Sequence, residues 1–142
     1  MAKKLNFFSP FRAQIIDDAL NLARSGLLSY DIALQVTNYL ANEVEYIPWA
    51  AALKELNYLK EMLEKTTAYE NFKKYINKLV KPVYNRLGYK PDPNYKPLDI
   101  FFHKLILKWA CNVVKTSCDF KVKGEFTTWM DKLDPDSEES NV

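Results

Sequence analysis

Glycine and histidine are scarce in this sequence, and each shortage excludes a class of functional site. Three glycines occur in 142 residues, which is too few for the glycine-rich loops that cradle phosphate groups. The single histidine, His103, excludes metal-hydrolase centres and acid–base sites built from several imidazoles. The formal net charge of +2 provides no basic excess of the kind that nucleic-acid-binding domains need, so we expect no nucleic-acid partner.

Long apolar runs are also missing. No stretch approaches the roughly 18 consecutive apolar residues of a membrane-spanning helix. The N-terminal segment MAKKLNFFSPF contains two lysines but only a short apolar patch, which Asn6, Ser9 and Pro10 interrupt. It therefore lacks the apolar core of a secretory signal. We expect neither a membrane span nor a signal peptide in this sequence.

Apolar residues are nevertheless plentiful, and they recur at helical spacing along almost the whole chain. They make up 48% of the sequence. Their recurrence every three or four residues is typical of helices that bury one face. The spacing predicts an all-α protein of about six helices joined in antiparallel pairs. Periodicity alone leaves an α-solenoid and an irregular bundle open as architectures.

The sequence also predicts the bounds and buried residues of individual helices. The first is predicted over residues 9–24, with Ile15 on its buried face. The second is predicted over residues 29–40, with Ile32 pointing inward. Pro82 falls inside a later apolar run of helical spacing and predicts a kink or a break at that point.

Cys111 and Cys118 form the most informative pair of residues for a covalent link. On an unbroken helix their Cα atoms would be about 10.5 Å apart in rise alone, whereas a disulfide needs roughly 4.4–6.8 Å. A bridge therefore requires the helix to end between them. Two reduced cysteines packed as small apolar side chains are the alternative that the residues leave open. Because His103 is the one further ligand of this kind, we expect no metal site.

His103 lies four residues after Asp99, so the two side chains could meet on one helical turn. No nucleophile stands at a spacing that would complete a catalytic group, and we expect His103 to be an ordinary surface residue. The carboxylates of Asp17–Asp18 and of Glu43–Glu45 do not face each other at a spacing of one or two residues on a helix. We therefore predict no catalytic residue.

Ordered sequence blocks carry a family resemblance beyond periodicity. Residues 12–24 (RAQIIDDALNLAR) resemble the opening of the C-terminal helical domain of zinc aminopeptidases of the aminopeptidase N type, which endoplasmic-reticulum aminopeptidases share. Similar blocks follow in order at residues 30–34, 45–53 and 109–111. The resemblance extends over residues 12–130, and arthropod aminopeptidase N enzymes look closest. The matching positions to which it gives a structural role are Arg12, Gln14, Asp17, Asp18, Arg24, Tyr46, Pro48 and Trp49.

The resemblance implies an architecture and a compartment. In that family the domain is a superhelix of antiparallel helix pairs, of armadillo/HEAT character, which closes over the catalytic chamber and limits peptide access. The resemblance also implies that Cys111 and Cys118 are bridged, which indicates an extracellular or luminal location. A cytoplasmic location is the alternative, because no signal peptide is recognised.

The resemblance further implies that any chemistry lies in another part of the enzyme. The family's zinc motif H-E-x-x-H and its G-x-M-E-N motif belong to a separate domain, and neither occurs in this sequence. We therefore expect this chain to bind no cofactor, although the family uses zinc. The chain by itself is expected not to be an enzyme.

These expectations define a domain plan and a function. We expect an N-terminal extension over residues 1–10, a partial helical domain over 11–130, and an acidic, disordered tail over 131–142 with five acidic residues and one lysine. The expected function is that of a non-catalytic metalloaminopeptidase fragment, whose partners are a catalytic module or peptides. A stand-alone protein- or peptide-binding module is the alternative, followed by a carrier of small apolar ligands. The open ends of a shortened superhelix also predict self-association.

Overall fold

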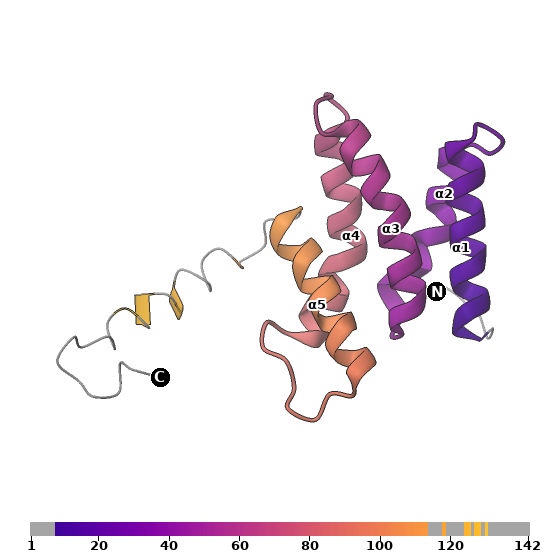
Figure 1. Ribbon diagram of the computed structural model, residues 1–142. Coiled ribbons are helices and arrows are strands. Elements are labelled where there is room, and N and C mark those ends of the chain that lie inside the picture. Colours follow the sequence, from indigo (N-terminus) through magenta and orange to yellow (C-terminus); the bar gives the residue numbers. More distant parts are fainter. Residues whose placement is uncertain (1–7, 114–117, 119–123, 126, 129, 131–142) are drawn as a thin grey trace.

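Five α-helices and one 3-10 helix make up the described part of the computed structural model, which covers residues 8–113 together with 118, 124, 125, 127, 128 and 130 (Figure 1). In chain order they are α1 (Ser9–Arg24), α2 (Tyr30–Val36), η1 (Thr37–Asn42), α3 (Tyr46–Leu63), α4 (Tyr69–Leu87) and α5 (Pro97–Asn112). No strand occurs among those residues, so the predicted all-α class is confirmed. Three of the four apolar residues that predict a sixth helix, Val122, Phe126 and Trp129 but not Met130, lie outside the described residues, as does the whole acidic tail.

Successive helices run in opposite directions and share one apolar core (Figure 1). α3 packs between α1 and α5, while α4 contacts both η1 and α5. The largest fully buried side chains come from several of these elements and include Ile16, Leu40, Trp49, Leu56, Ile76 and Ile106. Burying side chains of this size contributes about 1.5–3 kcal/mol each, so the helix pairs depend on one another for stability.

Residues suited to helix ends fix the turns between the helices. The Ser29 side chain accepts a hydrogen bond from the backbone N–H of Asp31 at 3.2 Å and thereby caps α2. Gly88 ends α4 with a φ of +75°, a conformation that glycine adopts without strain. Pro97 opens α5, where the missing N–H of a proline has no cost.

The structure places two predicted core residues at the surface. Ile15 is 43% exposed and Ile32 is 51% exposed, so both inward assignments are wrong. The reason is the direction of packing: α2 and α3 contact the side of α1 that carries Ile16 and Leu20, both almost fully buried. Ile15 lies about 100° around the helix from Ile16 and therefore turns toward solvent.

The segment predicted as a single helix over residues 29–40 consists of two elements. α2 ends at Val36 and the chain tightens into the 3-10 helix η1. In a 3-10 helix, side chains three residues apart lie in line, so Thr37 and Leu40 are both fully buried. The Thr37 hydroxyl donates a hydrogen bond to the carbonyl of Leu34 at 2.7 Å, which satisfies a polar group in the core.

Pro82 lies inside α4, which continues unbroken from Tyr69 to Leu87. Of the two outcomes that the sequence predicts there, a broken helix is therefore wrong. Val80 and Val83 on either side of Pro82 are fully buried. Their burial contributes about 1.5–3 kcal/mol each, which offsets the roughly 3 kcal/mol that an interior proline costs.

The long helices are amphipathic. α4, for example, buries Phe72 and Ile76 but exposes Lys74 and Lys78 on its opposite face. Across the residues that the structure describes, no helix combines the length and the apolar character that crossing a bilayer requires.

Candidate functional site

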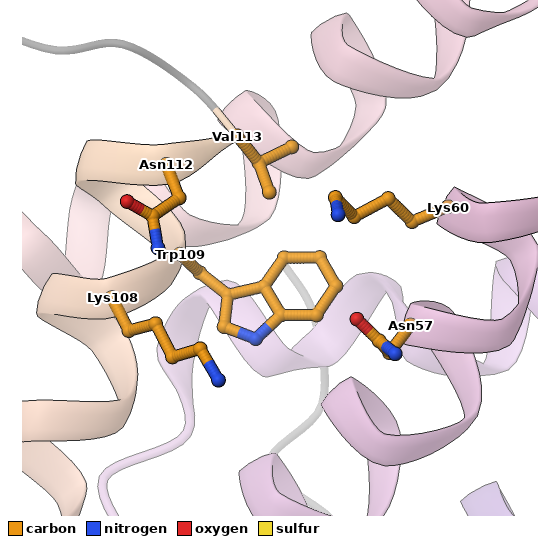
Figure 2. A pocket seen from close by; sticks show the side chains of 6 residues that line it. All are labelled: Asn57, Lys60, Lys108, Trp109, Asn112 and Val113. Atoms are coloured by element: carbon orange, nitrogen blue, oxygen red, sulfur yellow. The ribbon is translucent and has the colours of Figure 1, made fainter. Parts of the chain in front are cut away.

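A small groove opens between α3 and α5 (Figure 2). Its volume is about 50 Å³, and its lining residues are Asn57, Lys60, Lys108, Trp109, Asn112 and Val113. α3 supplies Asn57 and Lys60, the end of α5 supplies Lys108, Trp109 and Asn112, and Val113 directly follows α5. The Trp109 ring lies between the two lysine side chains, with its indole nitrogen on the side of Lys108 (Figure 2). We call this feature the α3–α5 groove.

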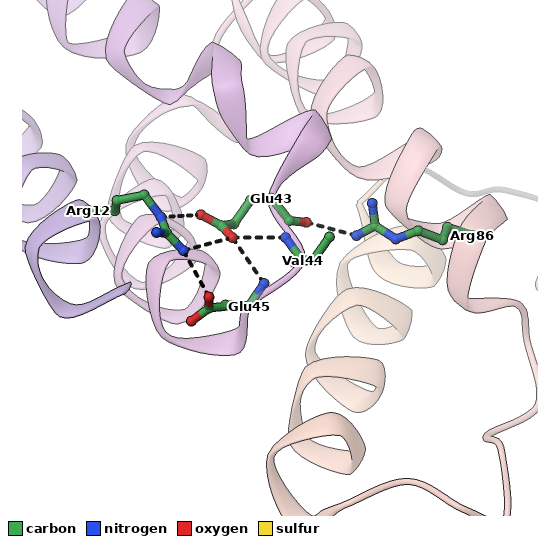
Figure 3. Close-up of polar contacts among 5 residues, drawn as sticks. All are labelled: Arg12, Glu43, Val44, Glu45 and Arg86. Carbon is green, nitrogen blue, oxygen red and sulfur yellow. Dashed lines mark hydrogen bonds and ion pairs between the residues drawn. The ribbon is translucent and has the colours of Figure 1, made fainter. Parts of the chain in front are cut away.

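A second polar feature joins three elements at the start of α3 (Figure 3). The Arg12 guanidinium, from α1, donates to Glu43 through Nε at 2.7 Å and through Nη2 at 3.2 Å. Its Nη2 also lies 3.2 Å from a carboxylate oxygen of Glu45. From α4, Arg86 donates to the backbone carbonyl of Glu43 at 2.8 Å. We call this feature the Arg12–Glu43 joint.

The Glu43 carboxylate in this joint is almost completely enclosed. Its side chain is 5% exposed, and that of Arg12 is 11% exposed. Besides the two bonds from Arg12, Glu43 accepts the backbone N–H groups of Val44 at 2.9 Å and of Glu45 at 3.1 Å. With four donors around it, the carboxylate is not free to take a proton from a substrate. Its role is to hold the η1–α3 connection against α1.

The groups of the joint also shift the pKa values of Arg12 and Tyr39. The hydrogen bond to Glu43 raises the pKa of Arg12 above its ordinary value, although burial acts in the opposite direction. Burial raises the pKa of Tyr39 to about 12; the negative charge of Glu43 adds to this rise and the positive charge of Arg12 opposes it. The arrangement is therefore a paired ion set beside a neutral phenol, which stabilises packing.

His103 is buried, contrary to the prediction that it is a surface residue. It is 4% exposed, and its Nε2 lies 2.9 Å from the carbonyl of Gly88. The Tyr95 ring packs at 5.9 Å between centroids. The segment between α4 and α5 covers this face of α5, which is why a single polar side chain on the helix does not reach solvent. Asp99 bonds elsewhere, accepting the backbone N–H of Lys96 at 3.0 Å.

The available metal ligands do not fit a zinc ion. Cys111 and Cys118 form the disulfide that the family resemblance implied, with their Cα atoms 5.4 Å apart. Their sulfurs are therefore not thiolate ligands. The Nε2 of His103 already lies within hydrogen-bonding distance of the carbonyl oxygen of Gly88. Nowhere in the described part of the chain do three or more His, Cys, Asp or Glu side chains gather as a metal-binding group.

The remaining matched positions of α1 make local and inter-helix contacts. Gln14 donates to Asp18 at 2.7 Å along one turn of the helix. Asp17 lies 4.0 Å from the ammonium group of an α3 lysine. The Arg24 guanidinium lies 3.9 Å from the centroid of the Tyr58 ring on α3, a cation–π contact. All three contacts are consistent with structural roles on the polar side of α1.

The matched positions of α3 are apolar contacts. Pro48 and Trp49 are among the fully buried side chains. The Trp49 ring packs against Phe102 of α5 with centroids 6.5 Å apart. Tyr46 lies 6.1 Å from the ring of Phe101. These pairs hold the beginning of α3 against α5.

Exposed apolar side chains gather where α1, α3 and α5 begin. The three helices start at the same, lower end of the molecule in Figure 1. The large apolar side chains near these starts are between 41% and 79% exposed; they are Phe8, Phe11, Val44, Ile47, Leu98 and Phe101. We call this surface the apolar end. Gathered exposed apolar side chains are typical of a surface that contacts another protein or domain.

Sequence reasoning missed the α3–α5 groove and the Arg12–Glu43 joint. Lys60 and Lys108 belong to different helices, and nothing in their local sequence connects them. Arg12 and Glu43 are 31 residues apart. Arg12, Glu45 and Trp109 lie in the family-like blocks over residues 12–24, 45–53 and 109–111, but nothing in those blocks indicates which residues they contact.

Comparison with known proteins identifies the family. Residues 5–140 match the family described as "ERAP1-like C-terminal domain". The chain is 41% identical to aminopeptidase A of Gloydius brevicauda over 109 residues, which is 76% of this chain and 11% of that protein. It is 36% identical to glutamyl aminopeptidase of Bitis rhinoceros over 132 residues, 92% of this chain and 14% of that protein. It is also 40% identical to aminopeptidase N of the arthropod Plutella xylostella over 100 residues, 70% of this chain and 11% of that protein.

The chain thus spans only 11% to 14% of the length of these curated relatives. The match over residues 5–140 nevertheless covers almost the whole sequence. The identities of 36% to 41% with these relatives agree with that match. The chain belongs to the ERAP1-like C-terminal domain family.

Proposed function

We propose that this chain serves as a non-catalytic helical domain of an aminopeptidase, which caps a catalytic module and limits the access of peptides to it. The family match over residues 5–140 is the observation that carries this proposal. Relatives named aminopeptidase A and aminopeptidase N contain the matching region as a small share of their length. The mechanism would be steric: helix pairs arranged as part of a superhelix form one wall of the space that a peptide must enter.

The apolar end supports a role that depends on contact with another module. Phe8, Phe11 and Phe101 are each more than half exposed. Aromatic side chains of this size are enriched at the centres of protein interfaces. Covering them with a catalytic module would remove apolar surface from water and stabilise the association.

We further propose that peptide hydrolysis is supplied by other parts of such an enzyme. The donor set described above does not fit zinc, and the Glu43 carboxylate is fully occupied by hydrogen bonds. The chain contributes shape and contact surface, and it performs no proton transfer.

The proposed location is extracellular or luminal. The disulfide between Cys111 and Cys118 supports this, because such bonds persist in oxidising compartments and are rare in the cytosol. Reaction of the protein from its native source with a thiol-specific reagent, with and without prior reduction, tests this proposal. Two free thiols before reduction would contradict it.

The central experiment adds the purified chain to an aminopeptidase N catalytic module that lacks its own C-terminal helical domain. We expect the two to associate, and we expect hydrolysis of long peptides to slow more than hydrolysis of a single-residue chromogenic substrate. The variant Phe11→Asp combined with Phe101→Asp should weaken association, whereas Lys74→Asp on the exposed face of α4 should not. Absence of association, or equal slowing of both substrates, would contradict the proposal.

Two measurements on the chain alone complete the test. Peptidase activity of the chain with added zinc would contradict a non-catalytic role. Size-exclusion chromatography with light scattering distinguishes the alternative of a stand-alone binding module: a monomer that does not associate with the catalytic module would favour that alternative. Self-association that Phe11→Asp abolishes would instead show that the apolar end needs a partner.

A further inference from the structure

The disulfide between Cys111 and Cys118 holds its two sulfurs in different surroundings. Cys111 belongs to the last turn of α5 and is partly exposed to solvent. Cys118 is 1% exposed and forms part of the apolar core. An attacking thiolate approaches a disulfide sulfur from the side opposite the bond that breaks, so it needs open space beyond that sulfur. The Cys111 end of the bond is therefore the accessible one.

A hydroxyl group lies beside the buried sulfur. The hydroxyl oxygen of Tyr84, on α4, is 3.7 Å from the Sγ of Cys118. A disulfide sulfur carries no proton, so the hydroxyl is the donor in this contact, and the neutral sulfur is a weak acceptor. A thiolate would accept the same bond more strongly, because charge-assisted hydrogen bonds are roughly twice as strong as neutral ones. Tyr84 is therefore placed to stabilise negative charge on Cys118.

These surroundings give the two cysteines different roles in thiol–disulfide exchange. We propose that Cys111 is a site of reversible S-thiolation by a low-molecular-weight thiol of the glutathione type. The thiolate of that molecule attacks the Sγ of Cys111 and forms a new sulfur–sulfur bond with it. The bond to Cys118 breaks, and its electron pair leaves with Cys118 as a thiolate, which accepts the hydrogen bond from Tyr84. No other oxidant or reductant takes part, because one sulfur–sulfur bond replaces another and the charge is conserved.

The modification is reversible because the displaced thiolate belongs to the same chain. Attack of the Cys118 thiolate on the Sγ of Cys111 releases the small thiol and restores the bridge. While the adduct persists, the position of Cys118 beside α4 depends on non-covalent contacts such as that with Tyr84. The site thus links the thiol content of an oxidising compartment to the side-chain bond that closes the chain after α5. It goes beyond the proposed capping role and does not depend on it.

Peptide mass spectrometry of the 142-residue chain tests which cysteine reacts. The oxidised, folded chain is exposed briefly to reduced glutathione, and all thiols are then blocked with excess N-ethylmaleimide. We expect most singly modified molecules to carry glutathione on Cys111 and the maleimide on Cys118. The chain unfolded in urea is the control and should give about equal amounts of both patterns, because neither sulfur is covered there. The opposite pattern, equal amounts in the folded chain, or an adduct only in the unfolded chain would overturn the proposal.

The rate of adduct formation tests Tyr84 as a positioning residue. Tyr84→Phe should slow the appearance of the adduct about threefold, because the departing thiolate loses a hydrogen-bond donor. Tyr75→Phe is the matched control on the same helix, since its hydroxyl meets Thr37 rather than a sulfur, and it should leave the rate unchanged.

An unchanged or higher rate in Tyr84→Phe, or equal slowing by Tyr75→Phe, would overturn the role given to Tyr84. The position of the adduct in the wild-type chain tests the role of Cys111 even if Tyr84→Phe fails to fold. These outcomes leave the capping role untouched, because they do not involve a catalytic module.

Discussion

The Arg12–Glu43 joint and the α3–α5 groove are both built from charged side chains on neighbouring helices, but they differ in pairing. In the joint, a buried guanidinium and a buried carboxylate satisfy each other and the backbone around them. In the groove, Lys60 and Lys108 have no carboxylate partner within the described part of the chain. A paired, enclosed charge fixes how helices pack, whereas a solvated surface charge adds little to packing. Mutations should therefore reduce stability strongly at the joint and weakly at the groove.

The largest loss of stability should follow the removal of Glu43. Glu43→Ala removes the enclosed carboxylate that accepts two bonds from Arg12, and breaking a buried ion pair in this way costs about 3–5 kcal/mol. We expect the urea midpoint of the chain to fall accordingly. Glu45→Ala is the matched control, because its carboxylate contacts the same guanidinium but is 52% exposed and should cost less than about 1 kcal/mol. Equal effects of the two changes would mean that burial does not set the strength of the joint.

Loss of the disulfide should have the next largest effect. Replacing both Cys111 and Cys118 by serine releases a short loop in the unfolded chain, which costs about 2 kcal/mol. Thermal unfolding of the double variant, compared with the wild type before and after reduction, measures this effect. A double variant as stable as the oxidised wild type would show that the disulfide does not stabilise the fold.

Tyr75 should make the chain less stable at alkaline pH. Its hydroxyl meets Thr37 in the core, and burial raises the pKa of Tyr75 to about 12, although the bond to Thr37 acts in the opposite direction. Between pH 10 and pH 12 the unfolded chain loses this proton while the folded chain keeps it. The contribution is therefore complete below pH 10 and is lost as pH rises toward 12.

Tyr75→Phe removes this titration and provides the test. Between pH 9 and pH 11 the variant should lose about 1 kcal/mol less stability than the wild type, as measured by urea unfolding at each pH. If the free energy of unfolding fell equally with pH in the two proteins, Tyr75 would not be the group that causes the loss.

The smallest effect should come from the groove lysines themselves. Lys60→Ala and Lys108→Ala remove no internal partner, so each should change stability by less than about 0.5 kcal/mol. The two changes combined should equal their sum to within about 0.5 kcal/mol, because water screens the two exposed charges from each other. A loss of several kcal/mol would mean that the lysines support packing, and the contrast with the joint would disappear.

Much of the fold could be predicted from periodicity because helices bury one face. The predicted first helix over residues 9–24 agrees with the observed α1, and the glycine at position 88 ends α4 as a helix terminator. Ile15 and Ile32 show the limit of this approach. Helical spacing places apolar residues on a broad stripe, but only the positions of the neighbouring helices decide which edge of that stripe is covered.

The candidate sites were less predictable for a related reason. His103 looked like a surface residue because its own helix gave no sign that the segment after α4 would cover it. The sequence places Glu43 beside Glu45 but gives no sign of its partner Arg12, which lies 31 residues earlier in α1. Local spacing reports on contacts within one helix, and both features depend on contacts between elements.

The sequence by itself determined the helical class, the family and the absence of the zinc motif, because these follow from apolar periodicity and from ordered blocks of residues. Residue spacing alone left open whether the two cysteines are reduced or bridged, and the family resemblance implied the bridge. Tertiary structure decided which charges pair with one another. Arg12 meets Glu43, and Lys60 and Lys108 lie on either side of the Trp109 ring (Figure 2), because packing brings distant helices together. Helical periodicity fixes the face of a side chain but not the helix that lies opposite it.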